Sequence, residues 1–140
     1  MLVRLLYASR ATNVTAGATD SILAQARSYN HAAGITGILC YGGDVFLQAL
    51  EGGRNQISEL YGHIQRDTRH KDVVLLHFEE INERRFSGWS MGQVNVGKIN
   101  AAILLKYSEK PVLDPYAVSG KVSLALLEDL MASASIGARS

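Results

Sequence analysis

Residues 35–53, ITGILCYGGDVFLQALEGG, carry the strongest structural signal in the chain. Two apolar runs, 35–41 and 45–51, flank a Gly-Gly-Asp segment, and this pattern predicts two antiparallel strands joined by a tight turn. Phe46, Gln48 and Leu50 alternate along the second run, so they share one face of its strand. A buried amide left without partners costs about 1–3 kcal/mol. The sequence therefore predicts specific hydrogen-bond partners for Gln48.

The segments on either side of this hairpin extend the pattern. Alternating or continuous apolar residues predict three further strands, and helical spacing of apolar residues predicts two helices. We expect the strands at 2–9, 73–81 and 89–96, and the helices at 21–34 and 52–67. The order β-α-β-β-α-β-β predicts a ferredoxin-like α+β fold, in which a five-stranded mixed sheet has both helices on one face.

The C-terminal part of the chain differs in character from the part before it. Two prolines interrupt it, and Ser119 is a candidate N-cap for a helix over 121–133. The Leu and Ile side chains of this part are expected to pack on the free face of the sheet or on a partner protein. We therefore divide the chain into a domain at 1–97 and a C-terminal helical extension at 98–140.

Composition argues against several classes of protein. The chain has 140 residues, 47% hydrophobic and 19% charged, with a net charge of +1. These values argue against a disordered chain and against a broad basic surface for nucleic acid. The single cysteine, Cys40, excludes an internal disulfide and is interpreted as a buried structural thiol. No apolar stretch approaches the length of a membrane span, so the default expectation is a soluble cytoplasmic protein.

Four polar or aromatic side chains fall on faces that should otherwise be apolar. Tyr7 lies on the first strand, Asn30 on the first helix, Gln48 on the third strand and Trp89 on the fifth. The predicted topology brings them together between the helices and the sheet, where two amides suit a planar heterocycle with alternating donors and acceptors. Each also has a purely structural interpretation, such as a satisfied core tyrosine, a helix C-cap for Asn30, or core packing for Trp89.

Other chemistries have weaker support. His63 and Asp67 have a spacing that allows metal ligation, but no further histidine is placed to complete such a site. The basic cluster at 66–71 is interpreted as a solvated surface, with a single phosphate contact as the alternative. A small ferredoxin-like enzyme such as an acyl-phosphate hydrolase needs an arginine near the end of the first strand, where Arg10 lies. The low net charge disfavours a single-stranded RNA binder.

Five segments together resemble the BLUF family, which comprises blue-light sensors that use FAD. The segments are RLLYAS at 4–9, YNHAAGITGILCY at 29–41, FLQALEG at 46–52, HIQRDTRH at 63–70 and RRFSGWSMG at 84–92. They occur in the family's order and coincide with the unexplained polar positions. The resemblance implies a photoreceptor that is not an enzyme, with a flavin between the two helices. The chain resembles the short members, which carry only a small helical extension.

The resemblance also implies roles for individual residues. Tyr7 matches the family's photoactive tyrosine, Gln48 its switching glutamine, and Asn30 the asparagine at the flavin's pyrimidine edge. The implied photoactive set is Tyr7, Ser9, Gln48, Trp89 and Met91. The implied FAD-binding set is Tyr7, Ile22, Asn30, Phe46, Gln48, His63, Ile64, Arg66 and Asp67. Light would then move an electron and a proton from Tyr7 and leave the hydrogen bonds around Gln48 rearranged until the dark state returns.

Two positions depart from the family pattern. Tyr29 and His63 stand where some members have asparagine and arginine, and Arg66 or Arg69 are candidates for the missing charge. The implied output is a contact with an unidentified downstream signalling protein, made through the last strand and the C-terminal helices. The resemblance implies no nucleic-acid or membrane partner and leaves a homodimer open.

Overall fold

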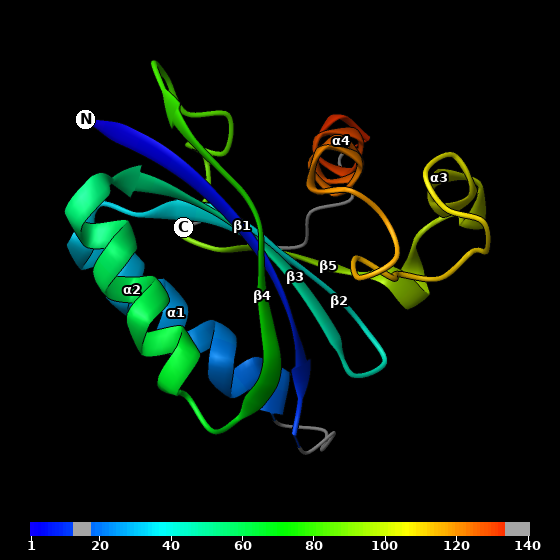
Figure 1. Cartoon of the computed structure of the whole chain (residues 1–140), viewed down its shortest axis with the longest axis horizontal. Helices are drawn as coiled ribbons and strands as arrows, with labels where there is room; N and C mark the ends of the chain where they lie inside the picture. The colour runs from blue at the N-terminus through cyan, green and yellow to red at the C-terminus, as the bar shows by residue number, and fades with distance from the viewer. Residues whose placement is uncertain (13–17, 134–140) are drawn as a thin grey trace.

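The computed structural model describes residues 1–12 and 18–133, and the predicted element order is confirmed there. The strands are β1 (Leu2–Ala11), β2 (Thr36–Gly42), β3 (Val45–Gly53), β4 (His70–Ile81) and β5 (Gly92–Asn95). The helices are α1 (Ala18–Ala33), α2 (Arg54–Arg66), α3 (Ala101–Leu105) and α4 (Gly120–Ala132), with a short 3₁₀ turn at Val96–Lys98. Helices α1 and α2 cover one face of the sheet, and α4 lies on the other (Figure 1). The ferredoxin-like α+β fold is therefore confirmed.

The five strands form one mixed sheet in the order β4-β1-β3-β2-β5. The four longer strands pair antiparallel, whereas β5 pairs parallel with β2. The predicted hairpin consists of β2 and β3, and Gly43 in its turn has a φ of 59°, which glycine adopts without steric cost. Because β1 and β3 are neighbours inside the sheet, Tyr7 and Gln48 lie on adjacent strands.

Each face of the sheet has its own hydrophobic core. On the α1 and α2 side, strand residues such as Leu5 and Leu50 pack with Ile57 of α2. The apolar stripes predicted for the two helices face this core, through Ile22, Ala26, Ala33, Leu60, Tyr61 and Ile64. Cys40 belongs to the other core and is fully buried, as predicted, and burial raises the pKa of its thiol to about 12. The sheet therefore separates two independently packed layers.

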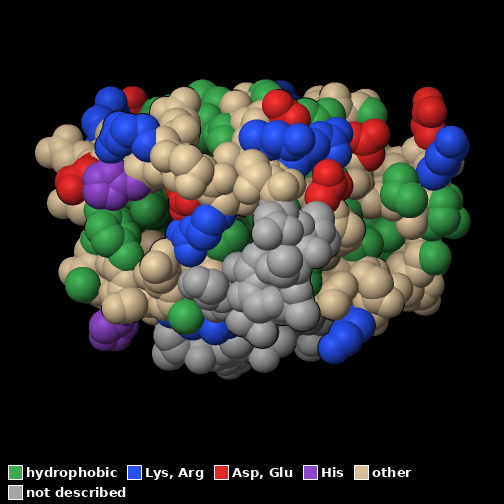
Figure 2. All heavy atoms as spheres, turned by 90° about the horizontal axis from the view of Figure 1, so that it is seen from below, with side chains coloured by type: hydrophobic (Ala, Val, Ile, Leu, Met, Phe, Trp, Pro, Cys, Tyr) green, Lys and Arg blue, Asp and Glu red, His purple; other side chains and the backbone are tan. Residues whose placement is uncertain are grey.

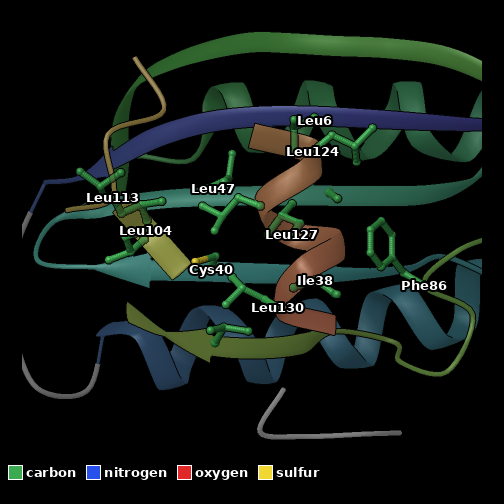
Figure 3. Packing of buried hydrophobic residues seen from close by; sticks show 14 of the residues in the cluster. Leu6, Ile38, Cys40, Leu47, Phe86, Leu104, Leu113, Leu124, Leu127 and Leu130 are labelled. Carbon is green, nitrogen blue, oxygen red and sulfur yellow. The ribbon is translucent and has the colours of Figure 1, made fainter. Parts of the chain in front are cut away.

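The C-terminal extension packs on the free face of the sheet, one of the two predicted positions. Leu124, Leu127 and Leu130 of α4 point at this face (Figure 3). Ser119 is the N-cap of α4, as predicted, because its Oγ accepts a hydrogen bond from the backbone of Val122 at 3.2 Å. Within 1–12 and 18–133, no helix is both long enough and apolar enough to span a membrane.

The fifth strand is shorter than predicted. The prediction began it at residue 89, but β5 covers only Gly92–Asn95. The carbonyls of residues 89, 90 and 91 accept hydrogen bonds from Gly37 N (3.1 Å), Asn30 Nδ2 (2.9 Å) and Arg27 Nε (3.2 Å), respectively. Because two of these three donors are α1 side chains, this stretch bonds mainly to a helix, and only the third donor, Gly37, belongs to the neighbouring strand β2. The regular β2–β5 register starts only at Gly92.

Candidate functional site

The register of β1 and β3 places Tyr7 directly opposite Gln48. Both side chains are buried, and the Tyr7 hydroxyl donates a hydrogen bond to Gln48 Oε1. Burial raises the pKa of the Tyr7 phenol far above its ordinary value, and the nearby Tyr61 and Asp67 add to this. The phenol therefore keeps its proton and acts as a donor. One predicted partner of Gln48 is thus identified.

The nitrogen end of the Gln48 amide has a different kind of partner. Gln48 Nε2 donates to the Met91 sulfur at 3.2 Å, and Met91 is almost completely buried. A thioether is a weak acceptor, whereas a tyrosine hydroxyl is a full hydrogen-bond donor. The amide is therefore held firmly at its oxygen and weakly at its nitrogen.

Asn30 has one amide atom that finds no hydrogen-bond partner among the described residues. The side chain is fully buried, and its Nδ2 donates to the Ser90 carbonyl at 2.9 Å, so it does not cap α1. Its Oδ1 is buried and accepts no hydrogen bond from the part of the chain that the structure describes. A buried unpaired acceptor costs about 1–3 kcal/mol. Asn30 is therefore suited to accept a hydrogen bond from a ligand N–H group.

A cavity of about 250 Å³ lies between α1, α2 and the sheet. Six predicted site residues line it: Tyr7, Ile22, Gln48, His63, Ile64 and Asp67. Phe46 belongs to the hydrophobic core beneath the helices, and Asn30 is buried next to the Ser90 carbonyl. Arg66 is exposed on α2 and is not brought to the cavity. The structure thus assembles most, but not all, of the predicted binding set.

Arg69 and His70 also line the cavity. Both belong to the basic cluster that was interpreted as a solvated surface, with a single phosphate contact as the alternative. His70 Nδ1 lies 2.9 Å from Ser9 Oγ, and the His70 and Tyr7 rings are 6.4 Å apart. Burial lowers the pKa of His70, which favours the neutral ring. Arg69 Nε lies 3.0 Å from the Asp67 carboxylate, and this hydrogen bond lowers the pKa of Asp67.

A local signal could have distinguished Arg69 from Arg66, the two candidates for the missing charge. Asp67 Oδ1 accepts a hydrogen bond from the Arg69 backbone N–H at 2.9 Å, which closes an Asx turn directly after α2. Such a turn fixes the direction in which the next residues leave the helix. The Asp-x-Arg spacing therefore predicts a folded-back side chain in place of a solvated one.

Trp89 does not converge with the other three residues, contrary to the prediction. It packs in the core on the α4 side, while Met91 packs on the side of Tyr7 and Gln48. The reason is the irregular backbone of residues 89–91, which does not follow the two-residue alternation of a strand. Met91 takes the place beside Gln48 that the prediction gave to both residues.

The alternative enzymatic interpretation depended on Arg10, and its guanidinium is already engaged. Arg10 lies 3.7 Å from the Asp44 carboxylate and 3.9 Å from that of Asp72, and it stacks 4.5 Å above the Tyr116 ring. These partners occupy the cation that an anion-binding loop would need. Residues 13–17 of the proposed loop lie outside the described residues.

The side chains around the cavity fit a planar heterocycle such as a flavin ring. Ile22 and Ala26 of α1 face Leu60 and Ile64 of α2, so apolar walls come from both helices. The weakly held Gln48 N–H supplies a donor in the lining, and the unpaired acceptor of Asn30 is buried on α1 outside the lining residues. A flavin ring carries carbonyl and N–H groups along one edge, so this donor set matches its chemistry.

Comparison with known proteins agrees with the resemblance to the BLUF family. Residues 2–92 match the model of the BLUF family, "sensors of blue-light using FAD". A photoactivated adenylate cyclase subunit beta from Euglena longa is 36% identical over 92 residues, which are 64% of this chain but only 11% of that protein. This chain therefore matches only a small part of that curated relative.

Solved structures extend the comparison to nearly the whole chain. The dark-state structure of the BLUF protein BlrB is 33% identical, with a TM-score of 0.80 over 95% of this chain and 96% of the other. Klebsiella pneumoniae BlrP1 with FMN and cyclic diGMP is 34% identical, with a TM-score of 0.68 over 76% of this chain and 29% of that one. Since the family match covers residues 2–92, which include β1 to β4, the first residue of β5 and the two helices that flank the cavity, the chain belongs to the BLUF family of blue-light sensors.

Proposed function

We propose that this chain is a blue-light sensor that holds FAD between α1 and α2 and uses Gln48 as its hydrogen-bond switch. The observation that carries the proposal is the buried chain Tyr7–Gln48–Met91, which reaches the cavity at Tyr7 and Gln48. The family description names FAD. A related structure contains FMN, so the identity of the flavin is part of the proposal.

Different residues around the cavity are proposed to hold different parts of the flavin. Ile22 of α1 and Ile64 of α2 would hold the ring between the helices, and Gln48 and Asn30 would bond to its polar edge. Asp67 is paired with Arg69, so this end of the cavity offers both an acceptor and a cation for the ribityl and phosphate groups. When bound, the flavin supplies the blue-light absorption and a transient acceptor for an electron.

The switch itself is built from residues of this chain. Tyr7 keeps its proton because it is buried, and the proton lies on a direct hydrogen bond to Gln48 Oε1. If the Gln48 amide turns over, its NH₂ group faces Tyr7, so the Tyr7 oxygen becomes an acceptor and Met91 loses its donor. One glutamine therefore supports two hydrogen-bond patterns, and burial keeps their energies distinct.

The output is proposed to leave through the opposite side of the sheet. We take residues 1–97 as the sensor domain and 98–140 as the extension that contacts an unidentified downstream protein. The Euglena relative is a cyclase subunit, but we assign this short chain no catalysis of its own. Basic and acidic side chains lie close together on the face shown in Figure 2, which suits a protein partner better than a nucleic acid.

The test is optical. The purified protein should be yellow, extraction should release FAD, and illumination should shift the visible absorption to the red with return in the dark. Gln48→Leu should retain flavin and lose the shift. Gln93→Leu on β5 serves as the matched control and should behave like the wild type. A colourless protein, or a normal shift in Gln48→Leu, would refute the proposal.

A further inference from the structure

A buried ion pair that the proposed photochemistry does not use lies on the α4 side of the sheet. Arg4 on β1 and Glu51 on β3 are direct register partners, and both are at most 1% exposed. Arg4 Nε and NH2 lie 2.8 and 2.7 Å from Glu51 Oε2. The Arg4 guanidinium also reaches Glu79 on β4 at 2.8 Å. A buried charge pair of this kind contributes little stability over an apolar pair of similar volume, so its presence calls for another explanation.

The remaining contacts of Glu51 supply that explanation. Glu51 Oε1 accepts a hydrogen bond from the Phe86 backbone N–H at 2.7 Å, and Oε2 accepts one from the Arg85 N–H at 3.1 Å. Phe86 is fully buried in the α4-side core (Figure 3). The carboxylate therefore fixes the middle of the segment that connects β4 to β5, residues 82–91. Hydrogen bonds to a charged acceptor are the stronger class in proteins.

The same connection carries the partner of the switch. Only a few residues after Phe86, the chain reaches Met91, whose sulfur accepts from Gln48. Side chains of α1 hold the carbonyls of residues 90 and 91, so the connection is fixed in its middle and at its C-terminal end. In addition, the Arg85 side chain forms an ion pair with Glu128 of α4. One connection thus contacts the C-terminal helix in its middle and the switch at its C-terminal end.

We propose that Glu51, held by Arg4, is a positioning residue that fixes the β4–β5 connection, and through it the Gln48–Met91 contact and the tie to α4. This inference rests on the proposed function. Without the carboxylate, the connection loses its two backbone anchors and Met91 packs less closely against the Gln48 amide. The amide then turns with less obstruction, so the dark state returns faster.

The test distinguishes a positioning role of the Arg4–Glu51 pair from a purely structural role. In the double variant Arg4→Met/Glu51→Leu, apolar side chains replace the ion pair, which leaves no buried charge unpaired and preserves the fold. Amide exchange of Arg85 and Phe86 should accelerate by about tenfold or more. Dark recovery should accelerate by about two- to thirtyfold, the range of coupling effects of single sites. The matched control is Asp129→Asn, which breaks the exposed Lys106–Asp129 pair and should change neither measurement.

The outcomes are distinct. A double variant with wild-type exchange and wild-type recovery overturns the inference, because a purely structural ion pair predicts that result. If the double variant does not fold, Glu51→Gln removes one anchor: its amide oxygen can still accept from Phe86 N–H, but its NH₂ group cannot accept from Arg85 N–H. Exchange at Arg85 and dark recovery should then still accelerate, and wild-type values of both would overturn the inference. A wild-type protein without any light-induced shift refutes the proposed function, and this inference with it. Normal wild-type photochemistry with an unchanged variant refutes only this inference.

Discussion

The buried bond between Tyr7 and Gln48 predicts a specific pattern of stabilities among four proteins. These are the wild type, Tyr7→Phe, Gln48→Leu and the double variant. Tyr7→Phe leaves Gln48 Oε1 without its donor, and Gln48→Leu leaves the Tyr7 hydroxyl without its acceptor. The double variant removes both polar groups and leaves an apolar contact in their place.

The expected losses of unfolding free energy follow from the burial of both side chains. Tyr7 and Gln48 are 3% and 5% exposed, so water does not replace the lost partner. Each single variant should therefore lose about 1–3 kcal/mol of unfolding free energy, whereas replacing both partners by apolar groups is close to neutral. The coupling energy between the two sites then equals the sum of the two single losses, about 2–6 kcal/mol. For a chain of this size, each single variant should lower the Tm by about 3–9 °C.

Urea unfolding followed by circular dichroism measures all four free energies, with every protein at the same flavin saturation. The double variant should be more stable than the sum of the two single losses predicts. Additive losses, with a coupling energy below about 0.5 kcal/mol, would show that the two groups are not bonded to one another. The same proteins then serve for light-minus-dark spectra, in which all three variants should lack the red shift.

Three further predictions concern stability. Burial lowers the pKa of His70 below the unfolded value of about 6.5. The free energy of unfolding should therefore fall as the pH drops from 6.5 through the folded-state pKa. In urea unfolding, His70→Asn should reduce this loss between pH 7 and 5. Leu127→Ala should lose about 2–5 kcal/mol in the same assay, because Leu127 is fully buried against the sheet. Leu105→Ala, at an exposed site, is its control and should change stability by less than about 0.5 kcal/mol. Ser119→Ala should cost about 1 kcal/mol in thermal unfolding, since it removes the N-cap of α4.

The sequence predicts well those features that repeat along an element. Strand alternation and helical spacing identified the strands and both covering helices, and the Gly-rich turn identified the hairpin. The polar exceptions on these apolar faces pointed to Tyr7, Gln48 and Asn30, which the structure buries on the predicted elements. A periodic pattern constrains many residues at once, so one irregular residue does not change its interpretation.

Features set by single long-range contacts were not predicted. Trp89 and Met91 were assigned to one strand face, but hydrogen bonds from Arg27 and Asn30 make that stretch irregular. His70 was assigned to a solvated loop, although Ser9, sixty-one residues away in the sequence, holds its ring beside the cavity. Neither contact leaves a periodic trace in the sequence, because each depends on where a distant element lies.

The run FLQALE at 46–51 shows both a periodic strand pattern and single long-range contacts. Gln48 and Glu51 are three residues apart, an odd spacing that places them on opposite faces of β3. Gln48 faces the cavity and Glu51 faces α4, yet both reach the same β4–β5 connection, one at Met91 and the other at Phe86. A rearrangement at Gln48 therefore has two routes to that connection, directly through the Met91 contact or through the shared strand. The Arg4→Met/Glu51→Leu variant removes the second attachment and loosens the Met91 contact without removing it, so light-induced changes that persist at α4 in this variant would assign the output to the Met91 route.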